Sequence, residues 1–352
     1  MKKNFILFLL LALGLTLHAN ASEAGQVPTG LEEEIQTEDT TLPPGLNVFQ
    51  TFTGHYGVST DGFGSTGQKG EIHATIPKNS TIIKAYLYSA AYNAQNEDIS
   101  GLKFNNSAVR FDKYYINPVN SSFMFKTGRA DVTAQVKATY NTVQQNDIYT
   151  FQIEENNAHV DGEALIVIYE NSALSPNTIA VIEGGANING DTFLMHFDEP
   201  LNPEDENFAL EMYLGISYSC CGQASRVTVN DQIITEQAGD YDDGKEQANG
   251  SLITVGGFDD PFSPNMPSYT EDHEKYNLKD YIKKNDTDVK LNTINPSKDD
   301  NLFLVVLKAS GTASVCDINS PCYQKGFADG KAFCKAHPKE CKIFPKTVVI
   351  PY

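Results

Sequence analysis

Aspartates gathered in the second half of the chain are the strongest candidates for binding chemistry. Ca²⁺ takes about six to eight oxygen ligands from carboxylates and carbonyls in loops, so these aspartates predict a cation site if the fold brings their turns to one rim. The spacing lacks the glutamate that an EF-hand loop requires at its end. Aspartates also cap turns and solvate loops, and this second interpretation stays open. The candidate ligands are Asp240, Asp242, Asp243, Asp259, Asp260, Asp299 and Asp300.

Cysteines are the second reactive group, and the chain has 6. In an exported protein an even set is expected to be oxidised. The adjacent pair Cys220 and Cys221 could close a strained vicinal disulfide, could remain as two separate or reduced thiols, or could have a redox or metal role. The other cysteines lie near the end of the chain: Cys316, Cys322, Cys334 and Cys341.

The C-terminal cysteines predict a local staple around a short helix. Cys322 and Cys334 are about three helical turns apart, so they cannot bond to each other within one unbroken helix. We therefore expect Cys316 and Cys322 to pair with Cys341 and Cys334 in some order. This tail resembles small cysteine-stapled tails of secreted bacterial proteins, and it would serve either as a stability clip or as a docking tail.

No catalytic motif is present. The 7 histidines are scattered without zinc spacing, and we expect His55, His73, His159 and His196 to be surface or turn residues. Gly64-Ser-Thr-Gly67 lacks the frame of a nucleophile elbow. A pair of carboxylates suited to glycoside hydrolysis cannot be recognised from spacing alone. The sequence therefore favours a protein that is not an enzyme.

The first residues of the chain predict export from the cytoplasm, and the net charge bears on the choice of partner. Residues 1–21 have the lysines, short apolar run and Ala19-Asn20-Ala21 site of a secretory signal peptide. Residues 22–44 are rich in acids, Thr and Pro, which is typical of a disordered leader. The net charge of −19 excludes nucleic acid as a natural partner. No later apolar run predicts a transmembrane segment, so we expect a secreted or periplasmic protein that could be peripheral at the cell surface.

Two apolar segments indicate the fold. Asp161–Glu170 and Asp299–Lys308 each follow a carboxylate-bearing turn and consist of Val, Ile, Leu and Phe, which predicts strands buried on both faces. A strand, a hairpin, a short helical turn and an alternating strand precede each segment in the same order, which indicates internal duplication. The alternative is that any two antiparallel sandwiches have a similar order of strands and hairpins, without duplication.

The local signals are specific enough to be checked. We expect hairpins over 102–111 and 226–234, with Asn105-Asn106 and Asn230-Asp231 at their turns. Residues 130–137 predict one helical turn capped by Asp131 or Thr133. The glycine-dense segment 53–67 predicts an irregular loop or edge strands with tight turns.

The fold class that follows is all-β, with two tandem antiparallel β-sandwich domains and a short disulfide-stapled C-terminal helix. The predicted boundaries are 45–172 for the first sandwich, 173–315 for the second and 316–352 for the cysteine-rich tail.

Two resemblances bear on the fold. Each half is loosely similar to galactose-binding-like jelly rolls. Tyr241-Asp-Asp-Gly244, Ala248–Gly257 and Asn295–Leu304 resemble a family of uncharacterised secreted β-sandwich proteins of bacteria and archaea. Asp161–Asn171 is similar to that family's Asp-Gly-Trp-aliphatic-Tyr-Glu segment, although Glu163 replaces the aromatic residue. The resemblance implies architecture and location rather than a role.

The sequence as a whole predicts a non-enzymatic binding or surface-structural protein, stabilised by Ca²⁺. Rim loops, including 54–67 and 240–260, would present amides, tyrosines and carboxylates to a glycan or protein. The alternatives are a secreted polysaccharide-active hydrolase and a subunit of an extracellular assembly.

Overall fold

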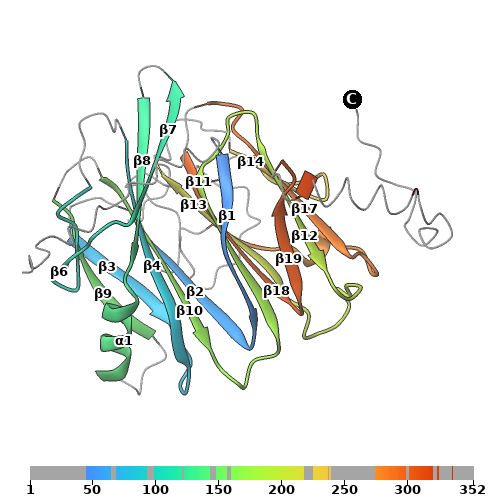
Figure 1. The fold of residues 1–352 in the computed structure, drawn as a ribbon, viewed down its shortest axis with the longest axis horizontal. Helices are drawn as coiled ribbons and strands as arrows, with labels where there is room; N and C mark the ends of the chain where they lie inside the picture. Colours follow the sequence, from blue (N-terminus) through green and yellow to red (C-terminus); the bar gives the residue numbers. More distant parts are fainter. Residues whose placement is uncertain are drawn as a thin grey trace, which may run out of the picture. The chain divides into compact units, whose positions relative to one another are not determined.

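The protein is described by a computed structural model that covers most of the chain after residue 44 (Figure 1). The described part is mostly antiparallel β-sheet, with one longer helix, α1 (Thr133–Thr142), and a single 3₁₀ turn, η1 (Lys279–Tyr281). The predicted all-β class is therefore confirmed. The described residues are 45–64, 69–92, 99–120, 123–142, 148–156, 160–217, 225–236, 238, 274–298, 301–319, 323–324 and 335.

The strands form four sheets, named A to D, and each is given below in the order of its hydrogen-bonded neighbours. Sheet A consists of β1 (Gly45–Gly54), β11 (Asn177–Gly185), β18 (Asn301–Ser310), β13 (Leu210–Ser217) and β16 (Lys275–Asn277). Sheet B consists of β2 (Tyr56–Gly64), β10 (Val160–Glu170), β4 (Thr81–Tyr92), β8 (Phe123–Asp131) and β7 (Lys113–Asn120). Sheet C consists of β3 (Lys69–Thr75), β9 (Ile148–Glu154), β5 (Lys103–Phe104) and β6 (Ser107–Ala108). Sheet D consists of β15 (Gln232–Thr235), β14 (Arg226–Val229), β17 (Asp288–Ile294), β12 (Asp191–Phe197) and β19 (Ala313–Asp317).

Three hydrophobic cores stack these sheets in the order D, A, B, C. Phe193 of sheet D packs in one core with Leu214 of sheet A. Phe303 of sheet A packs in a second core with Ile166 of sheet B. Leu87 of sheet B packs in a third core with sheet C. Sheets A and B are thus covered on both faces, whereas C and D each bury one face.

This stacking explains the two apolar segments. In β10 every residue except Glu170 is buried, and in β18 nearly every residue is buried. A strand between two cores cannot alternate polar and apolar residues, because both of its faces lie in apolar surroundings. The prediction of strands buried on both faces is confirmed for both segments.

The turn chemistry also follows the sequence. Asn105 and Asn106 have φ of 47° and 62°, and Asn230 and Asp231 have φ of 50° and 64°. Two successive residues with positive φ make the tight turn that matches the twist of paired strands, and Asn and Asp tolerate this conformation. Both predicted hairpins are confirmed, as β5–β6 and β14–β15.

The predicted helical turn is α1, which is longer than expected. Asp131 Oδ1 accepts a hydrogen bond from the Thr133 backbone N–H at 2.9 Å, so Asp131 is the capping residue at the start of the helix. The helix buries Val136 in the core between sheets B and C.

The segment 53–67 is not an irregular loop over its described residues, and this part of the prediction was wrong. Apart from a bend at His55, its residues up to Gly64 belong to β1 and β2, which are edge strands, the second of the two predicted possibilities. The glycines serve close packing: a Cβ on Gly57 would lie 2.5 Å from the Tyr169 ring. A segment that packs this closely in a strand does not form a rim loop for ligands.

Strand order relates the two halves. Sheet B contains the run β2-β10-β4, and sheet A contains the run β11-β18-β13, which occupies the matching places in chain order. Likewise β3-β9-β5-β6 in sheet C matches β12-β17-β14-β15 in sheet D. Strand β1 departs from a simple tandem division, because it pairs with β11 and so extends sheet A. The duplication and the domain boundaries stay predictions.

Candidate functional site

The residues predicted to bind Ca²⁺ lie outside the described part of the chain: Asp240, Asp242, Asp243, Asp259, Asp260, Asp299 and Asp300. The same holds for Cys220, Cys221, Cys322, Cys334 and Cys341 and for nearly all of the predicted C-terminal helix. Cys316 lies at the pairing of β19 with β12 and forms no disulfide with another described residue. Within the described ranges, no three Asp, Glu, His or Cys side chains are placed to hold a metal ion.

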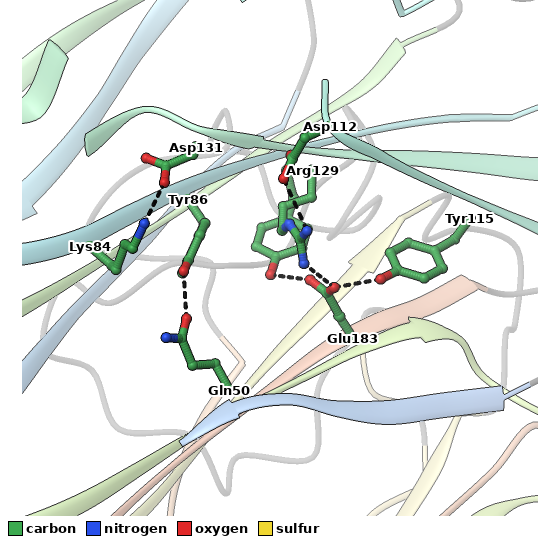
Figure 2. A network of polar contacts seen from close by, with 9 residues as sticks. Gln50, Lys84, Tyr86, Asp112, Tyr115, Arg129, Asp131 and Glu183 are labelled. Atoms are coloured by element: carbon green, nitrogen blue, oxygen red, sulfur yellow. Dashed lines mark hydrogen bonds and ion pairs between the residues drawn. The ribbon is translucent and has the colours of Figure 1, made fainter. Parts of the chain in front are cut away.

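A polar network crosses the interface between sheets A and B. Glu183, on β11, accepts hydrogen bonds from the hydroxyl groups of Tyr88 and Tyr115 and forms an ion pair with Arg129. Arg129 also pairs with Asp112, at 3.1 Å. Figure 2 shows Arg129 between Asp112 and Glu183, with Tyr115 reaching the same carboxylate from the other side. Both oxygens of Glu183 are therefore occupied from within the protein.

Burial governs the electrostatics of this network. Glu183 is 2 % exposed, and its burial raises the pKa above the ordinary glutamate value, although Arg129 opposes the shift. Burial together with the Glu183 carboxylate raises the pKa of both Tyr88 and Tyr115. The tyrosines thus remain neutral donors. Arg129 stacks 3.7 Å from the centre of the Phe49 ring, so a residue of β1 also contributes to the interface. The network thus links sheets A and B and fixes how they pack.

A second polar group lies at the beginning of β10. Asp161 and Glu163 are buried, and burial raises the pKa of each well above the usual carboxyl range. Neighbouring Glu155 raises the pKa of Glu163 further, whereas Ser89 donates a hydrogen bond to Glu163 at 2.9 Å. Burial therefore favours the neutral form of both carboxyl groups. Glu163 is thus a buried acid.

His73 and Asp61 form a third polar group between β3 and β2. Asp61 Oδ2 accepts the His73 backbone N–H at 2.6 Å and lies 3.3 Å from the His73 Nδ1 atom. Burial raises the pKa of Asp61 to about 7, while the contact with His73 acts in the opposite direction. The Asp61 hydrogen bond raises the pKa of His73. The prediction that His73 is a surface or turn residue was wrong, since it is a partly buried strand residue; His196, by contrast, forms an exposed pair with Asp288.

A groove of about 570 Å³ is the accessible candidate site. It lies where sheet A meets sheet D, between the β10–β11, β12–β13 and β18–β19 connections. Its polar lining consists of Asp198, Glu199, Asn202, Asp205, Asn207, Ser175, Ser310 and Thr312, and its apolar lining includes Phe197, Leu201 and Phe208. This volume falls in the range of small-molecule sites, about 300–1,000 Å³.

The β12–β13 connection is held in place on the side of Phe208. Asp205 Oδ1 accepts the Asn207 backbone N–H at 2.8 Å, and the Asp205 carbonyl accepts the Phe208 backbone N–H at 3.1 Å. Lys279 Nζ donates to the same carbonyl at 3.1 Å and lies 5.9 Å from the centre of the Phe208 ring. The ring is therefore fixed in the wall of the groove.

The other two walls are joined by backbone hydrogen bonds. Gly311 N–H donates to the Pro176 carbonyl at 2.9 Å, and Asp198 N–H donates to the Thr312 carbonyl at 3.1 Å. Three connections from distant parts of the chain thus form one preorganised surface, and a ligand would not have to order it.

Several groove side chains are available to a ligand. Asp198, Glu199 and Asn202 are exposed, and their side chains form no hydrogen bond or ion pair with other described residues. They offer carboxylate and amide groups beside a fixed aromatic ring, which suits a polar ligand with hydroxyl groups.

Sequence reasoning missed both the Glu183 network and the groove. A signal for the network exists, because Glu183 is a single acid within the apolar run of β11, and a buried charge requires a partner. Arg129 carries no comparable signal. The groove has none, because its walls come from segments that only the tertiary fold brings together.

Comparison with protein-family models, curated proteins and solved structures gives no match. The family resemblance is therefore unconfirmed, and the architecture rests on the sheets themselves. Within the described residues, no helix has the length and apolar character needed to cross a membrane.

Proposed function

We propose that the protein is an exported, non-enzymatic binding module that holds a neutral glycan in the groove between sheets A and D. The observation that supports this function is the set of Asp198, Glu199 and Asn202 side chains, unpaired among the described residues, beside the fixed Phe208 ring. Carboxylates and amides form hydrogen bonds with sugar hydroxyls, and an aromatic ring packs on the apolar face of a sugar ring.

Charge favours a neutral glycan over other ligands of similar size. The groove carries Asp198, Glu199 and Asp205, and the chain has a net charge of −19. Phosphorylated or sulfated ligands would be repelled. The signal-like residues 1–21 and the resemblance to secreted β-sandwich proteins support export, to the periplasm, the medium or the cell surface.

Groove variants test the proposal. We expect Asp198→Ala and Asn202→Ala each to weaken binding of a neutral oligosaccharide about tenfold, since each removes a hydrogen-bonding group. Binding would be measured by calorimetry after an array of neutral oligosaccharides has identified a ligand. Glu206→Ala is the matched control, because Glu206 is exposed on the same connection but does not line the groove.

Two results would contradict this function. Equal affinities for the groove variants and for Glu206→Ala would place the ligand elsewhere. Release of new reducing ends from the oligosaccharide by the wild-type protein, but not by Asp198→Ala, would identify the alternative hydrolase.

We further propose that Ca²⁺ stabilises the protein. The support for this proposal is the sequence alone, in which aspartates cluster in the second half of the chain. Saturation at about 100-fold above the Kd should add about 2.7 kcal/mol to the free energy of unfolding. A thermal melt of the oxidised protein with millimolar Ca²⁺ and then with EDTA measures this, and Asp242→Ala or Asp300→Ala should abolish the rise in midpoint. An unchanged midpoint on addition of EDTA would leave the aspartates as turn and solubility residues.

A further inference from the structure

Strand β7 forms one edge of sheet B. Its only hydrogen-bonded neighbour among the described strands is β8, and Figure 1 shows the β7–β8 hairpin projecting beyond the neighbouring strands. An edge strand has one row of backbone N–H and C=O groups without a strand partner, and such a row can template another strand.

The inner face of β7 is fixed by the polar network. The Tyr115 hydroxyl donates to Glu183, and Asn117 Nδ2 donates to Asn301 Oδ1 at 3.4 Å. Asn301 itself donates to Ser217 and Thr127. Strand β7 is thereby held on sheet A by contacts at alternate residues, so its edge is preorganised.

The outer face of β7 is apolar and exposed. Tyr114 and Ile116 alternate with the two anchored residues and are 44 % and 58 % exposed. Side chains two residues apart lie on the same face of a strand, so these two form a continuous strip. The strip borders the core between sheets B and C, since the ring centre of buried Phe111 lies 5.7 Å from that of Tyr114.

Basic side chains lie beside both faces of β7, in a chain whose net charge is −19. Lys126 Nζ lies 4.7 Å from the centre of the Tyr114 ring, and Lys113 Nζ lies 5.6 Å from that of Tyr115. Arg110 precedes the strand and is exposed. None of these three cations forms an ion pair with a described residue.

We propose that β7 binds an extended acidic polypeptide, which adds to sheet B as a further strand over Lys113–Asn117. Opposite charges on adjacent strands stabilise pairing and like charges oppose it, so Lys113 favours an acidic strand and disfavours pairing of β7 with β7 of a second copy. Pro118 has no backbone N–H, which limits the pairing at that end. This surface is separate from the groove, and the inference does not depend on the proposed glycan.

The test uses fluorescence anisotropy of a labelled peptide in which glutamate alternates with valine. The purified protein should bind this peptide, and Lys113→Glu/Lys126→Glu should weaken binding about tenfold or more. The matched control is Lys78→Glu/Lys137→Glu, which makes the same charge change at exposed positions on other elements and should leave the affinity unchanged.

A second peptide separates strand addition from simple charge attraction. Methylation of alternate backbone nitrogens keeps every charge but removes the hydrogen bonds of a paired edge, so binding should be lost. Equal binding of the methylated and parent peptides would overturn the proposal. So would binding of polygalacturonate without binding of the acidic peptide, because the occupant would then be an acidic glycan.

Discussion

Replacement of Arg129 by leucine should lower the free energy of unfolding by about 3–5 kcal/mol. The reason is that Glu183 is buried and Arg129 is its cationic partner, so the variant leaves a buried carboxylate with the two tyrosine donors alone. Leucine retains an apolar contact with Phe49, so lost packing contributes little. Urea unfolding followed by far-UV circular dichroism at neutral pH measures the change.

The surface pair Lys84–Asp131 provides the control for this prediction. Its Nζ–Oδ2 distance is 2.8 Å, but its side chains are 38 % and 39 % exposed (Figure 2). Lys84→Leu should therefore cost at most about 1 kcal/mol. The double variant Arg129→Leu/Glu183→Gln should recover part of the lost stability, because it also removes the buried charge. A loss for Arg129→Leu no larger than that for Lys84→Leu would refute the role of the pair.

Stability should fall between about pH 4 and pH 7, and Asp61 should account for part of the loss, together with the other buried carboxyl groups whose pKa is raised, Asp161, Glu163 and Glu183. Burial raises the pKa of Asp61 from 3.8 to about 7, so the folded state binds more protons than the unfolded state in this window. The raised pKa of His73 acts in the same direction, since its contribution is lost as the pH rises through the folded value. A shift of about three pKa units corresponds to about 4 kcal/mol.

Asp61→Asn tests this assignment because it keeps the shape and the acceptor for the His73 backbone N–H but cannot ionise. The variant should lose less stability than the wild-type protein between pH 5 and pH 8 in urea titrations. Asp288→Asn is the control, because it disrupts the other His–Asp pair, His196–Asp288, which is about half exposed. Equal losses for wild-type protein and Asp61→Asn would show that another group titrates.

Strands and tight turns could be predicted because their signals are local. The apolar run of β10 and the Asn105-Asn106 and Asn230-Asp231 turns each specify their conformation within a few residues. The segment 53–67 could not be decided between a loop and edge strands, because glycine is typical both of irregular turns and of strands that accept a close neighbour. Gly57 belongs to the second kind, since Tyr169 packs over it.

The sites could be predicted less well because they depend on tertiary pairing. Glu183 and Arg129 lie on β11 and β8, in different sheets, and only the stacking of A on B brings them together. The groove likewise joins Pro176, Asp198 and Gly311, which no spacing rule connects. The aspartates that the sequence predicts as Ca²⁺ ligands lie outside the described residues.

The place of β18 in sheet A has a consequence for how the protein is made. This strand lies between β11 and β13, although it is the last strand of the sheet in the chain, and β1 in turn pairs with β11. Pairings between residues so far apart in sequence fold slowly. During synthesis sheet A stays open until β18 has emerged. Until then β11 and β13 expose unpaired backbone N–H and C=O groups and apolar side chains, which could pair with other nascent chains and aggregate.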